Sequence, residues 1–252
     1  MRNEQHSQTD PALPYVGNNP VNSIDPFGLW SKPVRNKSEA WATICAGDGD
    51  TWKSLSELLK LNPNEAKKWV QNYDDKPESG KKYAIPNTVV TFTSKSTKWV
   101  SDGVLSFANE VRRIIKSDAK KYEKDGFHVI RHFQSDDSGE FVDEWGADGI
   151  YMYLFAGHGA YKDGKYYGFI IGDGQVTPDM IKSLKYKLAR VKALTCGSAL
   201  VQYNATAFDS NGNLVQSYWK SLVSSNGSFS GFDDWVNWVN GIDHFVTSPG
   251  SP

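Results

Sequence analysis

The stretch YMYLFAGHGA, residues 151–160, indicates the fold together with the later run VKALTCGSA, residues 191–199. Each is a short run of apolar residues, rich in aromatic or branched side chains, that ends in small residues. This pattern is typical of a buried strand followed by a loop. The first run ends at His158 and the second at Cys196. Because groups at the carboxyl ends of parallel strands converge at one edge of a sheet, we expect these two side chains to lie near each other.

Helical and extended patterns alternate around these two runs. Apolar residues recur at helical spacing from Asp102 to about Lys124, and the charged residues of this stretch, Arg112 among them, define the predicted outer face. Residues 127–133 then indicate a strand, and residues 141–145 a short helix. The alternation predicts an α/β fold in which a mostly parallel sheet is flanked by helices on both faces.

Further patterns complete this picture. A Lys-Asp-Gly turn within residues 161–167 predicts a hairpin. Thr177, followed by a proline, predicts the start of a helix that runs to about Leu188. Residues 89–101 are rich in Thr, Ser and Lys, and they indicate either a linker or the first strand of the last domain.

Composition is that of an ordinary globular protein. Hydrophobic residues make up 39% of the 252 residues and charged residues 23%, and 28 basic residues nearly balance 29 acidic ones. A net charge near zero creates no global field that attracts nucleic acid or anionic lipid, so we expect no nucleic-acid partner. No apolar run approaches the roughly 20 residues that span a bilayer, and the N-terminus lacks a basic and then apolar secretory pattern.

Cysteine and histidine are scarce. The chain has two cysteines, Cys45 and Cys196, too few for the disulfide framework of a small secreted domain, which predicts a reducing working compartment. Five histidines with no second cysteine near any of them give no zinc-ligand spacing, so we expect neither a metal nor a cofactor. Cys45 is expected to be a small buried hydrophobe.

Turn-forming residues are concentrated in YVGNNPVNSIDPFGL, residues 15–29. Composition alone favours an exposed linker here. The sequence of this segment, however, resembles the closing motif of the core shell of rearrangement-hotspot (Rhs) repeat proteins, which is YVGNNPVN followed by DPxGL. The resemblance implies that residues 1–29 end an Rhs core, and that the shell cuts the chain to free a variable C-terminal toxin beginning at Trp30. The residues that match the cleavage motif are Asp25, Pro26, Gly28 and Leu29.

Residues 39–88 have the pattern of a small βααβ unit. A Gly-Asp-Thr turn at residues 49–51 opens it, helical patterns lie on either side of the turn at residues 61–63, and residues 82–86 indicate a closing strand. These residues look like a lysin-motif (LysM) domain, which implies binding of N-acetylglucosamine polymers through residues 46–86. The alternative is a spacer that keeps only the fold.

A histidine or a cysteine that follows a strand is, taken alone, most often structural. The pair is different, because a thiolate nucleophile needs a base, and a developing oxyanion needs backbone N–H donors from a small-residue turn. The string LFAGHG, followed by a hairpin, a predicted helix and VKALTCGSA, resembles the caspase-like cysteine peptidases. The resemblance spans residues 102–200. It implies His158 as the base, Cys196 as the nucleophile, and the N–H groups of Gly159 and Cys196 as the oxyanion hole.

The same resemblance implies a peptidase domain over residues 102–247, followed by a tail at residues 248–252. The sequence departs from the family because the strand expected before the long helix is weak and the segment after Ala199 is short and polar. Substrate preference in this family comes from loops around the dyad. Three acidic residues are candidates for favouring a basic residue before the cut: Asp173, Asp233 and Asp234.

Together these resemblances predict an Rhs-associated toxin that hydrolyses peptide bonds through a thioester intermediate. Such a protein would be made in the bacterial cytoplasm and secreted or delivered into a target cell as part of the Rhs protein, in competition between bacteria. Its partners would be a protein substrate, a cognate immunity protein and the Rhs shell. The alternatives are an inactive glycan-binding or partner-binding module, a deamidase or transferase that uses the same dyad, and a nuclease.

Overall fold

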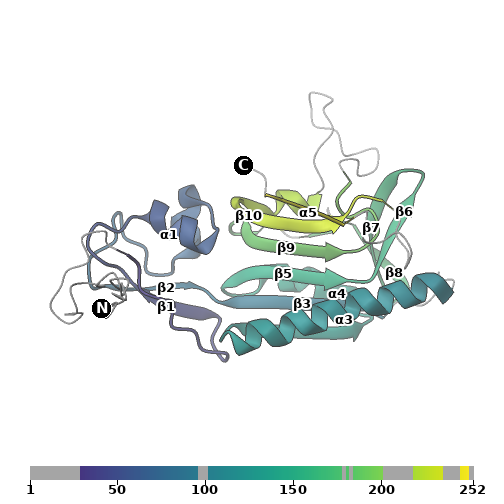
Figure 1. Ribbon diagram of the computed structural model, residues 1–252, viewed down its shortest axis with the longest axis horizontal. Helices are drawn as coiled ribbons and strands as arrows, with labels where there is room; N and C mark the ends of the chain where they lie inside the picture. Colours follow the sequence, from purple (N-terminus) through teal and green to yellow (C-terminus); the bar gives the residue numbers. More distant parts are fainter. Residues whose placement is uncertain are drawn as a thin grey trace, which may run out of the picture.

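A six-stranded sheet forms the centre of the molecule (Figure 1). The computed structural model describes residues 29–95, 102–177, 180–181, 184–200, 218–234 and 245–249. The sheet has the strand order β11-β10-β9-β5-β3-β4, in which all neighbours are parallel except β11, which is antiparallel to β10. Its strands are β3 (Thr88–Ser94), β4 (His128–Ser135), β5 (Ile150–Ala156), β9 (Leu188–Leu194), β10 (Val223–Phe232) and β11 (Phe245–Pro249).

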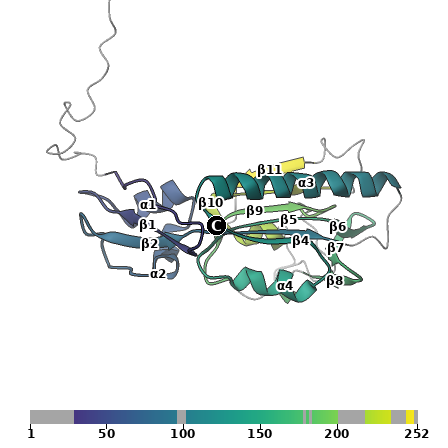
Figure 2. The same ribbon diagram turned by 90° about the horizontal axis from the view of Figure 1, so that it is seen from below.

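Helices cover both faces of this sheet. The long helix α3 (Asp102–Lys124) lies on one face, and the short helix α4 (Ser138–Asp143), continued by the 3-10 turn η3 (Glu144–Gly146), lies on the other (Figure 2). A further short helix, α5 (Tyr218–Ser221), precedes β10. The molecule is therefore a mixed α/β protein with a mostly parallel central sheet, as predicted. No described helix is both long enough and apolar enough to cross a membrane.

An aromatic cluster fills the face beneath α4. Phe141 lies at its centre, with ring centroids between 5.0 and 6.1 Å from those of six other fully buried aromatic residues. Edge-to-face packing of this kind combines the burial of large apolar areas with favourable ring quadrupoles, so this cluster anchors the sheet. The six partners of Phe141 are Phe92, Trp145, Tyr153, Phe155, Phe169 and Trp219.

The opposite face packs against α3 through Val111, Ile115 and Ala119, which are buried as the helical spacing predicts. The prediction that Arg112 lies on the outer face is wrong, because its side chain is only 5% exposed. Its Nη1 donates a hydrogen bond to Asn109 Oδ1 at 3.0 Å. A periodic pattern assigns faces by residue type, whereas a long arginine stem can be buried when its guanidinium finds polar groups.

A smaller βααβ unit precedes the sheet, with its elements in the predicted order. Strands β1 and β2 pair in an antiparallel manner, and Thr51 caps the first helix by accepting a hydrogen bond from the Ser54 N–H at 3.0 Å. The indole of Trp52 stacks on Tyr73 with ring centroids 4.9 Å apart. The elements are β1 (Trp41–Cys45), α1 (Trp52–Leu59), η2 (Pro63–Glu65), α2 (Ala66–Trp69) and β2 (Lys82–Pro86).

The βααβ unit and the sheet are joined by buried contacts. The Tyr151 hydroxyl donates to the Leu59 carbonyl oxygen at 2.7 Å, and Arg35 places its guanidinium 3.8 Å from the centre of the Phe127 ring. The same guanidinium donates to Asn87 Oδ1 at 2.8 Å. Asn87 alone separates β2 from β3 along the chain. The two units therefore share a packed boundary rather than a free linker.

The sheet extends beyond the predicted domain limits of residues 102–247. Strand β3 begins before residue 102, and β11 includes two residues of the predicted tail, 248 and 249. Within the segment left open between linker and strand, residues 89–94 belong to β3 and residues 96–101 lie outside the described residues. Thr and Ser made β3 resemble a linker, yet all seven of its residues are buried. Its threonine hydroxyls bond to main chain, as Thr91 Oγ1 does with the Ile130 carbonyl oxygen at 3.1 Å.

Between β5 and β9 the chain forms a small three-stranded antiparallel sheet. It consists of the predicted hairpin, β6 (His158–Lys162) and β7 (Lys165–Ile171), with β8 (Gly174–Val176). The predicted helix from Thr177 to Leu188 is wrong at its C-terminal end, because residues 184–187 are not helical and Leu188 begins β9. Leu188 pairs with Val223 in the main sheet, which is a tertiary requirement that the local capping pattern does not reveal.

Candidate active site

The carboxyl ends of β5 and β9 lie side by side. Ala156 pairs with Leu194 at the last position of both strands, and the Gly157 N–H donates to the Leu194 carbonyl oxygen at 3.3 Å. Both strands point toward the end of the molecule that carries β6, β7 and β8 (Figure 1). His158 and Cys196 each follow one of these two ends, so the topology brings their turns to the same edge of the sheet.

Gly159 and Cys196 are in direct main-chain contact. A Cβ atom placed on Gly159 would overlap the Cys196 carbonyl oxygen and lie 2.9 Å from the Cys196 nitrogen. Only glycine leaves room for this approach. The structure thus brings together the three residues that the sequence predicted to carry the chemistry. His158 and Cys196 are both buried, each with 7% of its surface exposed.

His158 occupies a dry and electropositive environment. Burial, followed by the nearby charge of Arg112, lowers the pKa of His158 from its ordinary 6.5 to about 4. The imidazole is consequently neutral at pH 7. Its Nε2 atom is buried and makes no hydrogen bond within the described part of the chain. A buried ring nitrogen without a partner is costly in a folded protein, and such groups are characteristic of sites that bind or react.

Ser94 is a neighbour of the dyad that sequence reasoning missed. It is the last residue of β3, the strand next to β5, and a Cβ on Gly157 would overlap its Oγ. The Ser94 hydroxyl is also buried without a described hydrogen-bond partner. The chain runs outward from β3 in one direction and from β5 in the other, so Ser94 lies at the switch point where open sheets place ligands. A serine ending a core strand was the available signal.

Hydrogen bonds fix the shape of the Cys196 turn. Gly197 has φ +69° and donates its N–H to the Asp234 carbonyl oxygen at 3.0 Å. Ser198 donates its Oγ–H to the Ala193 carbonyl oxygen at 2.6 Å and accepts from the Phe232 N–H at 3.1 Å. The turn is held between β9 and the end of β10, which is the preorganisation that a nucleophile requires.

The candidate specificity residues separate into two groups. Asp234 is half-buried beside the turn, where Oδ1 accepts a 2.6 Å hydrogen bond from Tyr161 and helps to raise the pKa of that phenol to about 12. Asp233 is its exposed neighbour. Asp173 lies in the β7–β8 turn, three residues after Ile170, which pairs with His158. The adjacent Gly172 packs on Asp136 beyond the end of β4. Asp233 and Asp234 therefore follow the strand end that holds the Cys196 turn, whereas Asp173 follows the hairpin strand that pairs with His158.

The remaining predicted residues are not brought to this site. Cys45 is half-buried in the βααβ unit, with its Sγ 3.8 Å from its neighbour's carbonyl oxygen, and neither cysteine forms a disulfide. Asp25, Pro26 and Gly28 lie outside the described residues, and Leu29 is 69% exposed. Within the described ranges, no group of three His, Cys, Asp or Glu side chains is arranged to hold a metal ion.

No protein-family model, no curated protein and no solved structure matches this chain. What the site can do has to be argued from its residues.

Proposed function

We propose that the chain is a cysteine endopeptidase in which Cys196 is the nucleophile and His158 the base. The observation that supports this most directly is the main-chain contact between Gly159 and Cys196, next to a buried, neutral histidine. A structural histidine and cysteine need no such approach, whereas two adjacent main chains can aim two N–H groups at one oxygen atom.

The chemistry would proceed in two steps. Neutral His158 accepts the Sγ proton as the Cys196 sulfur attacks the substrate carbonyl carbon, and the negative charge on the carbonyl oxygen is held by the N–H groups of Gly159 and Cys196. The imidazolium then gives its proton to the leaving amine, so that the C–N bond breaks and a thioester remains. Water hydrolyses the thioester and restores the thiol.

The low pKa of His158 makes it a weak base in the free protein. Formation of the thiolate would place a negative charge beside the ring and favour the imidazolium, which offsets the cost of burial. Substrate binding that aligns the thiol with Nε2 is therefore part of the proposal.

We further propose that this peptidase is the toxin module of an Rhs protein, made in the bacterial cytoplasm and delivered into a target cell. The DPFGL motif supports this, and so does the accessibility of the proposed cleavage site between Leu29 and Trp30. Leu29 is 69% exposed, whereas Trp30 is buried and its Nε1 donates to Ser54 Oγ at 3.0 Å. A protease would reach the bond before Trp30 while the new N-terminus stays anchored. The βααβ unit is proposed to resemble a LysM domain.

Expression of the full chain in a bacterium tests the mechanism. We expect Cys196→Ala to abolish toxicity, and Cys45→Ala, the matched substitution of the other cysteine, to keep it. Purified protein should form a covalent adduct with a cysteine-directed electrophile at Cys196. Equal toxicity of the parent and of Cys196→Ala would exclude the dyad mechanism.

Product analysis separates hydrolysis from the other uses of a thioester. New protein N-termini in the intoxicated cell indicate a peptidase. Conversion of a side-chain amide to an acid indicates a deamidase, and transfer of the acyl group to an acceptor other than water indicates a transferase.

A further inference from the structure

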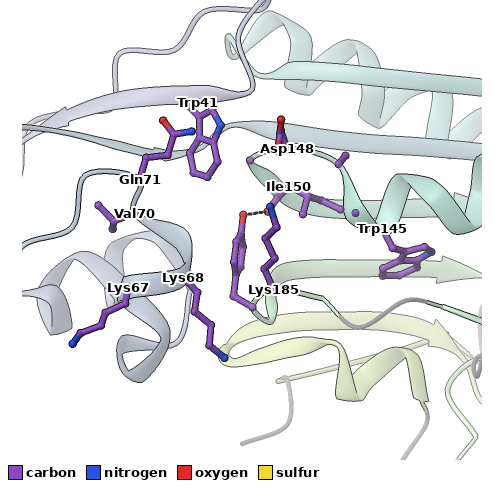
Figure 3. A pocket seen from close by; sticks show the side chains of 13 residues that line it. Trp41, Lys67, Lys68, Val70, Gln71, Trp145, Asp148, Ile150 and Lys185 are labelled. Carbon is purple, nitrogen blue, oxygen red and sulfur yellow. Dashed lines mark hydrogen bonds between the residues drawn. The ribbon is translucent and has the colours of Figure 1, made fainter.

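A pocket lies at the opposite end of the sheet from the dyad, between the βααβ unit and the amino ends of β5 and β9 (Figure 3). Its volume is about 440 Å³, within the range that accommodates a small ligand. The walls come from both units: Trp41 and Gln71 from the βααβ unit, and Asp148, Lys185 and Tyr186 from the sheet and its loops.

The floor of this pocket is preformed. Gly149 has φ +58°, and a Cβ there would overlap the Ala40 carbonyl oxygen and lie 3.3 Å from the Trp41 ring. The Thr88 hydroxyl donates to the Asp148 carbonyl oxygen at 2.7 Å, and the Tyr186 hydroxyl donates to the Ile150 carbonyl oxygen at 2.7 Å. A ligand would meet a loop that is already ordered, so little conformational entropy would be lost on binding.

The chemistry of the lining combines an aromatic wall with an excess of positive charge. Three lysines, Lys67, Lys68 and Lys185, line the pocket together with one acidic residue, Asp148. Lys68 pairs with Glu65 at 3.0 Å, and Lys67 lies over the Tyr73 ring at 5.6 Å.

Lys185 is different from the other two lysines. It makes no hydrogen bond or ion pair among those described. In Figure 3 its side chain extends toward Ile150, whereas those of Lys67 and Lys68 extend away from Trp41.

We infer that this pocket binds an acidic sugar, a pyranose ring that carries a carboxylate or a phosphate. The apolar C–H face of such a ring can pack on the half-buried Trp41 indole. The Gln71 amide can donate to and accept from hydroxyl groups, and the Lys185 ammonium supplies the charge that the anionic substituent requires. The inference is independent of the reactivity of Cys196, because the two sites occupy opposite ends of β5.

Calorimetric titration of the full chain tests this inference with five probes. Glucose 6-phosphate and N-acetylmuramic acid are the phosphate and carboxylate probes, glucose and N-acetylglucosamine are their neutral counterparts, and inorganic phosphate reports on charge alone. We expect at least one acidic sugar to bind roughly tenfold more tightly than its neutral counterpart and than inorganic phosphate, as one charge-assisted hydrogen bond provides. Which acidic sugar binds identifies the anionic group.

Variants then locate the site. Lys185→Gln should remove the preference for the acidic sugar, and Gln71→Ala should weaken its binding, whereas Lys120→Gln, an exposed lysine on α3, should leave it unchanged. Thermal melting of each variant confirms that it is folded. Equal affinity for acidic and neutral sugars, equal affinity for inorganic phosphate, or an unchanged preference in Lys185→Gln would each overturn the inference.

Discussion

The two ends of strand β5 differ in the polar groups that lie near them. At the amino end, the hydroxyls of Thr88 and Tyr186 are satisfied by main-chain carbonyls and the charged side chains are exposed, while the Trp145 indole N–H is buried without a described partner. At the carboxyl end, His158 Nε2 and Ser94 Oγ are buried without a described partner. Burying a polar group without a hydrogen bond costs about 1 to 3 kcal/mol, so folding alone does not favour the second arrangement. This difference is expected between an end that contributes to stability and an end that binds or reacts with a substrate.

The largest expected effect is a loss of activity caused by a substitution at the carboxyl end of β5. Gly159→Ala should reduce the proposed activity by about 100-fold or more, because the added Cβ overlaps the Cys196 carbonyl oxygen and separates the two main chains. Gly146→Ala is the matched control, since nothing lies within 4 Å of a Cβ at that glycine. Cleavage assays on both purified variants measure the effect, and full activity in Gly159→Ala would show that the contact is not needed.

The corresponding substitution at the amino end should affect stability instead. Gly149→Ala combines a left-handed φ of +58° with an overlap on the Ala40 carbonyl oxygen, and we expect it to lower the free energy of unfolding by about 4 kcal/mol. Denaturant titration measures this loss, again against Gly146→Ala. A change of less than about 1 kcal/mol would mean that the junction yields easily.

Acid should destabilise the folded protein because His158 is buried in its neutral form. Its pKa is about 4 in the folded protein against 6.5 when unfolded, so between these values the unfolded state binds more protons. The stability present above pH 6.5 is therefore lost as the pH falls through 4, by about 3 kcal/mol. His158→Gln should remove this part of the acid sensitivity in melts recorded across that range. Parallel pH profiles for parent and variant would contradict the account.

The smallest expected effect concerns the rim of the dyad. Asp234→Asn weakens the hydrogen bond from Tyr161 and should lower the free energy of unfolding by about 1 kcal/mol. It should also lower the pKa of Tyr161 from about 12 toward its ordinary value, because the bond to Asp234 is the main cause of the shift. Ultraviolet titration of the phenol reports this change. Asp173→Asn is the control, and an equal shift in both variants would argue against a local contact.

Local patterns predicted the features of the site that depend on local order. Apolar runs ending in glycine placed His158 and Cys196 at strand ends, and the helix–strand alternation predicted that these ends converge. The hairpin after His158 followed from its turn residues, and the long helix from its period.

What the sequence could not predict depends on packing between distant segments. Arg112 lies in a face that the helical period assigns to solvent, yet it is buried and lowers the pKa of His158. Strand β3 is polar in composition, and its threonines can be buried because they bond to the main chain of neighbouring segments. Only the assembled sheet supplies these partners. The Lys185 pocket is formed by two units whose relative placement no local pattern encodes.

The single residue between β2 and β3 has a mechanical consequence. Asn87 connects the βααβ unit to the strand that lies between β4 and β5, and its side-chain amide donates to the Asn36 and Glu39 carbonyl oxygens at 3.1 and 2.9 Å. A pull on the N-terminus would load the βααβ unit first, because that unit lies between the N-terminus and β3. Once it had unfolded, the force would act on β3 along its axis and shear the two parallel ladders to β4 and β5 at once.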